Sequence, residues 1–210
     1  MPDYRNGDVL VTYGTGGIWP PRRLVLWLVY QAIRAYQKVK WGERSDFGPT
    51  HVRVWIAGRF FEMTTPVGQW TDLATLKLDK KRWKVGRYRH QSATGLDADA
   101  MRATADAMVG NPYDRGDLLD FALAGLVGFF ARILRIFGDR RHKYRVCSTA
   151  AAKVLVAGGA QMRISHADLL PDAAINADLT ADESILPDDV IDPAYFVNNR
   201  SHWEIVSLRM

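Results

Sequence analysis

The chain has 210 residues, of which 48% are hydrophobic and 24% charged, and its formal net charge is +5. Enough apolar side chains are present for a sizeable core, which excludes a disordered chain and predicts one globular domain over residues 1–210. The single cysteine excludes an intramolecular disulfide and every zinc site that needs two or more thiolates. The mild positive charge is compatible with anionic partners but selects none of them.

The N-terminal segment MPDYRNGDVLVTY lacks the basic and apolar regions of a secretory signal. With the low cysteine content, this favours a reducing, cytoplasmic setting.

The first half of the chain predicts strands around one long helix. Residues 8–13 (DVLVTY) read as a short buried strand, and Leu24 to about Val39 as a helix that follows two prolines. Residues 51–57 (HVRVWIA) and 59–65 (RFFEMTT) predict a β-hairpin joined at Gly58. Alternation within the first hairpin strand places small β-branched residues on one face and His51 on the other.

The second half predicts mainly helices, over residues 97–109, 117–137 and 146–157, the last ended by two glycines. The acidic, proline-interrupted stretch 165–193 predicts loop. Further strands are expected near residues 84–90 and 203–208. The order of strand, helix, strands, helices and strand predicts one compact α+β domain.

Cys147 is the leading candidate for chemistry because it begins the run CSTAAAKVLVAGG. A thiol at a helix N-terminus lies near unpaired N–H groups and the positive end of the helix dipole, which lower its pKa. The same N–H groups can stabilise the oxyanion formed when a carbonyl is attacked. The alternative is a small buried side chain without chemistry, since free cysteine is among the most buried residue types.

His51 and Glu62 are the candidate partners of the thiol. His51 opens a predicted strand after a Gly-Pro-Thr turn, where its imidazole can project from the sheet edge and act as a base. Glu62 lies across the hairpin and could accept the other imidazole N–H, which would fix the tautomer. Taken singly, each residue could also be an ordinary strand side chain.

Several segments together resemble a known family. They are GDVLVT (7–12), THVRVW (50–55), FFEMTTPVG (60–68), NPYD (111–114), YRVCSTAAAKVLVAGG (144–159) and ILPDDVIDPAYF (185–196). In order and spacing, they look like the circularly permuted NlpC-like hydrolases of papain fold. The YiiX type is the most similar branch and is distantly related to the lecithin:retinol acyltransferase group.

The resemblance implies a permuted papain-like fold, with a small antiparallel sheet or partial barrel packed against helices. It also implies Cys147 as nucleophile at a helix N-terminus, His51 as base and Glu62 as third polar member. Tyr113, Tyr13 and Ser148 are implied more loosely as residues that bind substrate or assist the oxyanion. The expected activity is that of an amidase or peptidase, as on cell-wall peptide links, without metal or organic cofactor.

Two alternatives remain open at this point. The apolar segments 22–39 and 117–137 could be core helices, or they could contact a membrane peripherally and favour a lipid-directed thiol esterase or acyltransferase with the same triad. Charged residues interrupt 117–137, so its uninterrupted apolar length is too short to span a membrane.

The other alternative is a non-catalytic papain-like binding module. The basic cluster near Trp83 is too short to indicate nucleic-acid binding.

Overall fold

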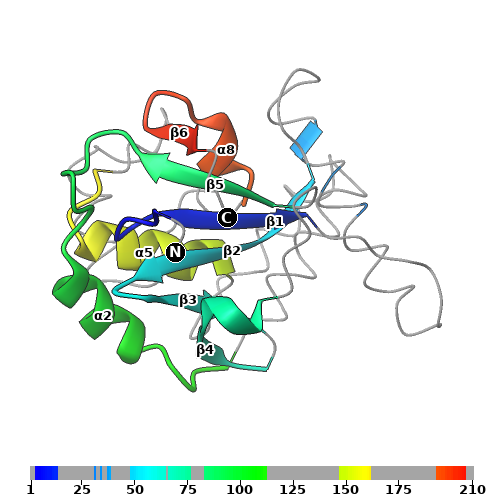
Figure 1. Ribbon diagram of the computed structural model, residues 1–210. Helices are drawn as coiled ribbons and strands as arrows, with labels where there is room; N and C mark the ends of the chain where they lie inside the picture. Colours follow the sequence, from blue (N-terminus) through cyan, green and yellow to red (C-terminus); the bar gives the residue numbers. More distant parts are fainter. Residues whose placement is uncertain are drawn as a thin grey trace, which may run out of the picture.

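The computed structural model describes residues 3–13, 31, 34, 37–38, 48–64, 66–76, 83–112, 147–161 and 193–206. These residues form an α+β structure built on an open, six-stranded antiparallel sheet with the order β4-β3-β2-β1-β5-β6 (Figure 1). The strands are β1 (Val9–Tyr13), β2 (Pro49–Ile56), β3 (Arg59–Met63), β4 (Gly68–Thr71), β5 (Trp83–Tyr88) and β6 (Trp203–Val206). The helices are the 3-10 helix η1 (Leu73–Thr75), α2 (Ala98–Asp106), α5 (Cys147–Ala157) and α8 (Tyr195–Asn198).

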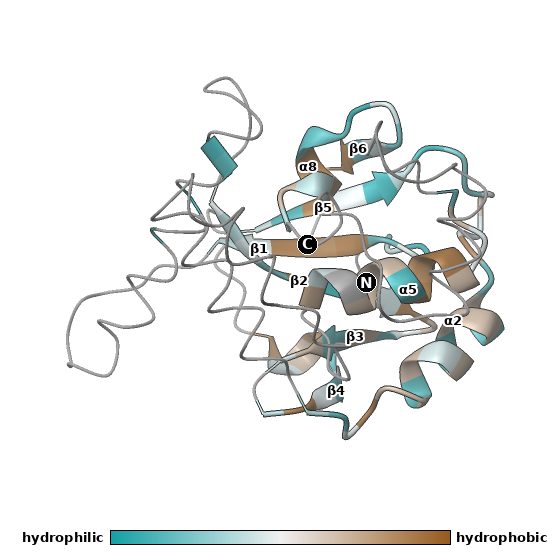
Figure 2. Ribbon diagram, turned by 180° about the vertical axis from the view of Figure 1, so that it is seen from behind, coloured by the Kyte–Doolittle hydropathy of each residue, from teal (hydrophilic) through white to brown (hydrophobic). Residues whose placement is uncertain are grey.

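One face of the sheet carries the main core. Alternate side chains of β1 and β2, among them Val9, Val11, Val52 and Val54, are fully or almost fully buried there. Helix α5 packs on β2 and β3, and α2 packs on α5, so the small residues of α5 allow a close approach to the sheet. Figure 2 shows apolar colouring along β1 and on parts of α5.

The opposite face of the sheet carries a smaller apolar cluster together with the polar side chains of His51, Arg53 and Glu62. Leu10, Phe60 and Val85 are buried in this cluster, with aromatic side chains around them. Trp55 stacks on Tyr4, with ring centroids 4.7 Å apart. Because strand residues alternate between faces, side chains two positions apart on β2 share this surface.

The β2–β3 hairpin turns through only two residues, Ala57 and Gly58. Both have positive φ, 45° and 95°, as a type I′ turn requires. The pairing then runs from Ile56–Arg59 to Val54–Phe61, where the ladder between the two strands ends. The turn therefore sets which β3 residues lie across from the beginning of β2.

The predicted strands at the N-terminus, in the hairpin, near 84–90 and near 203–208 are confirmed, as are the helices at 97–109 and 146–157 within a few residues at their ends. Helix α2 begins after Asp97, whose side chain accepts hydrogen bonds from the amides of Asp99 and Ala100. The sheet is open, so the antiparallel-sheet form of the prediction holds and the partial barrel does not. Strand β4 and the short helices η1 and α8 were not predicted.

The apolar segment 117–137 lies outside the described residues, as do most of the loop predicted at 165–193 and of the helix predicted at 24–39. Of this last helix, residues 31, 34, 37 and 38 are described and have helical backbone. Across the parts of the chain that the structure describes, no helix has the length and apolarity needed to cross a membrane.

A buried ion pair ties the start of β1 to β5. The Asp8 carboxylate is fully buried and accepts hydrogen bonds from Nε of Arg87 at 2.9 Å and from its Nη2 at 2.7 Å. The hydrogen bonds that Arg87 donates to Asp8 outweigh burial and raise the pKa of Arg87 above its ordinary value. A bidentate pair of this kind fixes the neighbouring strands in register.

Replacing Asp8 by Ala should lower the free energy of unfolding by about 3–5 kcal/mol, because it leaves the buried Arg87 charge without its carboxylate partner. Urea denaturation followed by tryptophan fluorescence measures the loss. The matched control is Asp72→Ala, which removes the exposed pair with Arg59 and should cost less than about 1 kcal/mol. Equal losses in the two variants would contradict the structural role of the buried pair.

Candidate active site

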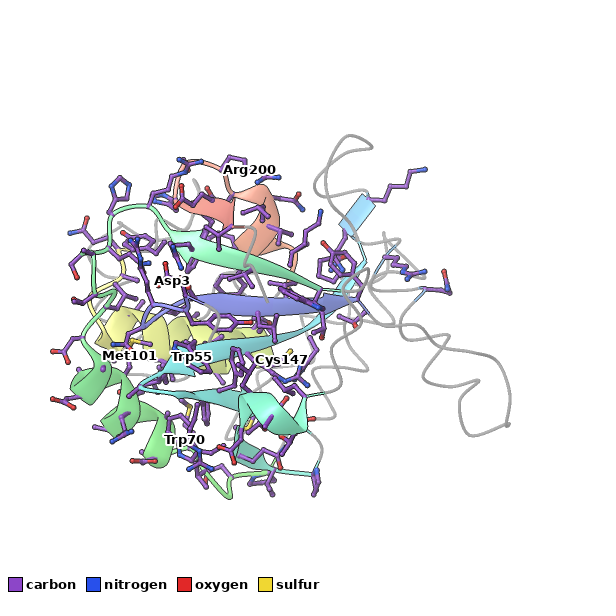
Figure 3. All side chains as sticks on the ribbon, viewed as in Figure 1. Asp3, Trp55, Trp70, Met101, Cys147 and Arg200 are labelled. Atoms are coloured by element: carbon purple, nitrogen blue, oxygen red, sulfur yellow. The ribbon has the colours of Figure 1, made fainter. Side chains whose placement is uncertain are left out.

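The only cysteine of the chain is the first residue of α5 and is nearly buried, with 5% of its surface exposed. Its sulfur accepts hydrogen bonds from the backbone amides of Val52 and Ser148. Val52 lies beyond the last residue pair of the β2–β3 ladder. Figure 3 shows how Cys147 lies among the side chains of the sheet and of α5.

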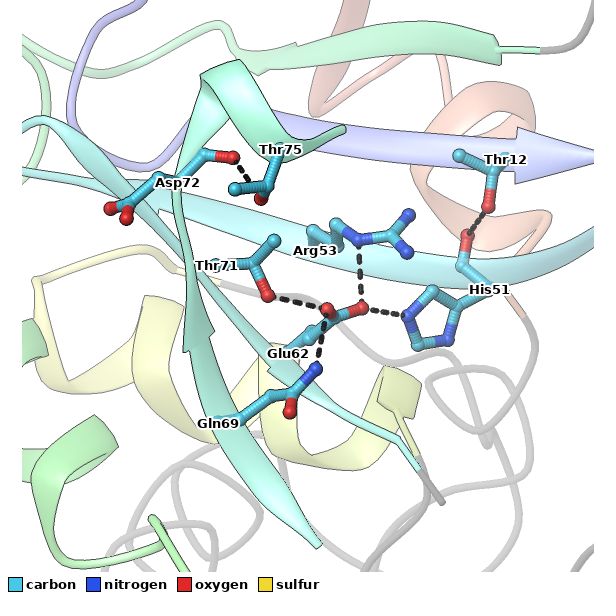
Figure 4. A network of polar contacts seen from close by, with 8 residues as sticks. All are labelled: Thr12, His51, Arg53, Glu62, Gln69, Thr71, Asp72 and Thr75. Atoms are coloured by element: carbon cyan, nitrogen blue, oxygen red, sulfur yellow. Dashed lines mark hydrogen bonds and ion pairs between the residues drawn. The ribbon is translucent and has the colours of Figure 1, made fainter. Parts of the chain in front are cut away.

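His51 lies on β2 between this sulfur and a carboxylate. Its Nε2 is 2.7 Å from Oε2 of Glu62 (Figure 4). The side chain also makes a hydrogen bond with Cys147. Since Nε2 is engaged by Glu62, the other ring nitrogen, Nδ1, is the one available to the sulfur. The imidazole is thus held on both sides, with 20% of its side chain still exposed.

Glu62 lies on β3 and is held by groups from the two neighbouring strands, β2 and β4. Besides His51 on β2, Oε1 accepts hydrogen bonds from the Thr71 hydroxyl at 2.6 Å and from the Gln69 amide at 3.2 Å, both on β4 (Figure 4). Nε of Arg53 is 2.7 Å from Oε2, an ion pair by distance in which the N–H does not meet hydrogen-bond geometry. With only 4% of its side chain exposed, Glu62 depends on these partners.

The pKa shifts follow from these contacts. Burial would lower the pKa of His51, but the hydrogen bond and charge of Cys147 and the bond to Glu62 outweigh it and raise that pKa. Burial would raise the pKa of the Cys147 thiol, but the hydrogen bond and charge of His51 outweigh it and lower that pKa. The two opposite shifts favour a thiolate beside an imidazolium.

The pKa of Glu62 moves in the direction that keeps it ionised. Burial would raise it, but the hydrogen bond and charge of His51, the charge of Arg53 and the Thr71 hydroxyl lower the pKa of Glu62 to about 2. A carboxylate that stays charged above that pH can hold the imidazole in one orientation.

The local sequence explains this assembly. The two-residue turn pairs Val54 with Phe61, and the same register extended by one residue brings Arg53 opposite Glu62. His51 lies two residues from Arg53 on the same face of β2. Glu62 in turn is paired with Gln69 on β4. The polar set is therefore a consequence of strand alternation on one sheet face.

Of the residues predicted from the sequence, the structure brings together Cys147, His51 and Glu62. Ser148 also lies at the site, but its side chain is fully buried and its contact with the sulfur is made by the backbone N–H. Tyr13 is the last residue of β1 and is paired with Pro49, two residues before His51. Tyr113 lies outside the described residues.

The sequence prediction did not identify Arg53, Gln69 and Thr71 as residues around the carboxylate. The alternation of His51, Arg53 and Trp55 was visible and places Arg53 on the face of His51, which could have indicated its position. No comparable signal marks Gln69 and Thr71, because β4 is only four residues long and was not predicted as a strand.

The arrangement offers thiol and imidazole chemistry. Within the described ranges, no group of three or more His, Cys, Asp or Glu side chains is placed to hold a metal ion. An activated thiol next to a held imidazole can attack an electrophilic carbon and exchange a proton with the leaving group.

Comparisons of the chain with models of protein families, with curated proteins and with solved structures found no match.

Alkylation of the single cysteine tests the thiolate directly. We expect iodoacetamide to modify native Cys147 with a midpoint below about pH 8.5, the value of a free thiol. His51→Gln should shift this midpoint upward, because the hydrogen bond and charge of the imidazole lower the thiol pKa. Intact mass gives the extent of labelling, and the urea-unfolded chain is the reference. A native midpoint at or above that of the unfolded chain would contradict the pairing.

Acid titration of stability tests the buried carboxylate. Because the folded pKa of Glu62 lies near 2 and the ordinary value is 4.5, Glu62 stabilises the fold above pH 4.5 and loses this effect as pH falls toward 2. The loss amounts to about 3 kcal/mol at most. Glu62→Gln should remove this part of the acid destabilisation, measured by urea denaturation at each pH. An identical pH dependence in both proteins would speak against a strongly lowered pKa.

Proposed function

We propose that the protein is a cysteine hydrolase that cleaves an amide bond through an acyl-enzyme on Cys147. His51 acts as base and acid, and Glu62 orients it. The observation that carries this proposal is the position of the His51 ring, which is bonded to Glu62 through Nε2 and to Cys147 on its other side. The order nucleophile, imidazole, carboxylate matches what a triad requires.

In the first half of the reaction, the Cys147 thiolate attacks the carbonyl carbon and forms a carbon–sulfur bond. The carbonyl oxygen becomes an oxyanion, which the unpaired amide N–H groups at the start of α5 can stabilise. The His51 imidazolium gives its proton to the leaving nitrogen as the carbon–nitrogen bond breaks. A thioester and a neutral imidazole result.

In the second half, His51 takes a proton from water, and the resulting hydroxide attacks the thioester carbon. The carbon–sulfur bond breaks, the carboxylic acid leaves and the thiolate returns. Glu62 keeps the ring in place through both steps without changing its own charge. If another acceptor replaced water, the same residues would transfer the acyl group.

The fold that we propose for this chemistry is the permuted papain-like one. Its support is the order of the chain, with the imidazole strand before the cysteine helix, and the packing of α5 on β2 and β3. From the family resemblance of the sequence we further propose a peptide substrate, such as a cell-wall peptide. The lipid-directed alternative rests on segments outside the described residues and stays a prediction.

Mutation of the nucleophile and the base tests the function. A panel of peptide amides and p-nitrophenyl esters is offered to the wild type, and a covalent acyl adduct is sought by intact mass. Cys147→Ala should reduce turnover to the background rate and abolish the adduct, and His51→Gln should slow turnover by about 10²–10⁴-fold. His90→Gln is the matched control, since His90 is an exposed histidine outside the site and its loss should leave turnover unchanged. Turnover that survives Cys147→Ala would refute the proposal.

A further inference from the structure

Arg53 is a cationic side chain beside the proposed base that the reaction described above does not use. It follows His51 by two residues on β2, so the two side chains leave the same sheet face about 7 Å apart at their origins. Its Nε lies 2.7 Å from Oε2 of Glu62, and 17% of the side chain is exposed.

The closest contact of this guanidinium with Glu62 is made by one nitrogen, Nε. No residue in the described part of the chain accepts a hydrogen bond from its two terminal nitrogens, Nη1 and Nη2. Arginine usually binds carboxylates through two parallel N–H groups, and no such pair of hydrogen bonds joins Arg53 to Glu62. The two terminal nitrogens, Nη1 and Nη2, are therefore available to bind an anionic group of a ligand.

Glu62 does not need Arg53 as a hydrogen-bond donor. His51 serves Oε2, and Thr71 and Gln69 serve Oε1. The charge of Arg53 contributes to the ionised state of Glu62, but a partly desolvated guanidinium whose terminal nitrogens lack hydrogen bonds is unfavourable. A bound anion that accepts hydrogen bonds from the terminal nitrogens would explain why an arginine stands at this position.

We propose that Nη1 and Nη2 of Arg53 bind an anionic group of the acyl substrate, a carboxylate or a phosphate, while Cys147 attacks the neighbouring carbonyl. This inference rests on the proposed function and adds the substrate class to it. A planar carboxylate or a phosphate presents two oxygens at the spacing of the guanidinium fork. The His51 and Arg53 side chains start about 7 Å apart, which is the length of about two extended residues, so the anionic group lies within about two residues of the scissile bond.

Two alkylating reagents of nearly equal size provide the test. Iodoacetate is an anion and iodoacetamide is neutral, and both react fastest with a thiolate, of which this chain can offer only one, so peptide mapping of Cys147 gives both rates. The ratio of their rate constants cancels any change in the thiol pKa, because both reagents use the same thiolate. We expect Arg53→Gln to lower the ratio of iodoacetate to iodoacetamide by about tenfold, since the anion loses its cationic partner.

Arg59→Gln is the matched control, because it removes the same charge from the next strand at a half-exposed position paired with Asp72. It should leave the ratio near that of the wild type. Arg53→Lys is a second variant that keeps the charge while removing the fork, and it should retain part of the preference for iodoacetate. An unchanged ratio in Arg53→Gln, or an equal drop in Arg59→Gln, would overturn the inference.

Competition on the wild-type protein gives an independent measurement that needs no substitution. Inorganic phosphate and succinate should slow iodoacetate labelling more than sodium chloride does at equal ionic strength. The stronger of the two competitors identifies phosphate or carboxylate as the preferred group. Protection no greater than that by chloride would overturn the inference.

These outcomes separate the inference from the proposed function. If iodoacetamide labels Cys147 only above about pH 8.5, the thiolate itself is missing and the proposed function fails. If iodoacetamide labels it near neutral pH, but neither Arg53 nor the competing anions affect the ratio, only the anion site fails.

Discussion

The enclosed carboxylate of Glu62 is the constraint on which the site depends. An ionised group with so little exposure needs donors on both oxygens, and it obtains them from β2 and β4. Three neighbouring strands are therefore joined by polar contacts as well as by their backbone ladders. One of these contacts orients the His51 ring. The buried Glu62 carboxylate therefore both positions the imidazole and joins the three strands.

The sulfur is coupled to this network through the ring. His51 and Cys147 shift each other's pKa in opposite directions, and the amides of Val52 and Ser148 add further stabilisation of the thiolate. Helix α5 reaches the sheet closely because Ala150, Ala151 and Ala152 are small and buried. Packing and charge thus act together, since the small side chains bring a helix N-terminus to the one strand that carries an imidazole.

Much of this arrangement was predictable from the sequence. Alternation gave the β2–β3 hairpin and the face of His51, and the alanine-rich run gave a helix that begins at Cys147. Strand β4 was not predicted, because four residues that begin with a glycine carry too little periodicity to indicate a strand, and Gln69 and Thr71 were missed with it. The contact of Arg53 with Glu62 was missed for another reason: it depends on strand register, which a single strand pattern does not give.

The turn at Ala57 and Gly58 has a consequence for how this chain can vary. Its two residues fix the register of β3 against β2. A strand displaced by one position would present every side chain to the opposite face of the sheet. Lengthening or shortening the connection by one residue would carry the Glu62 carboxylate into the aliphatic layer under α5 and bring Phe61 beside the imidazole. Across diverging descendants of this chain, the length of that connection should therefore be preserved even where its residue types drift.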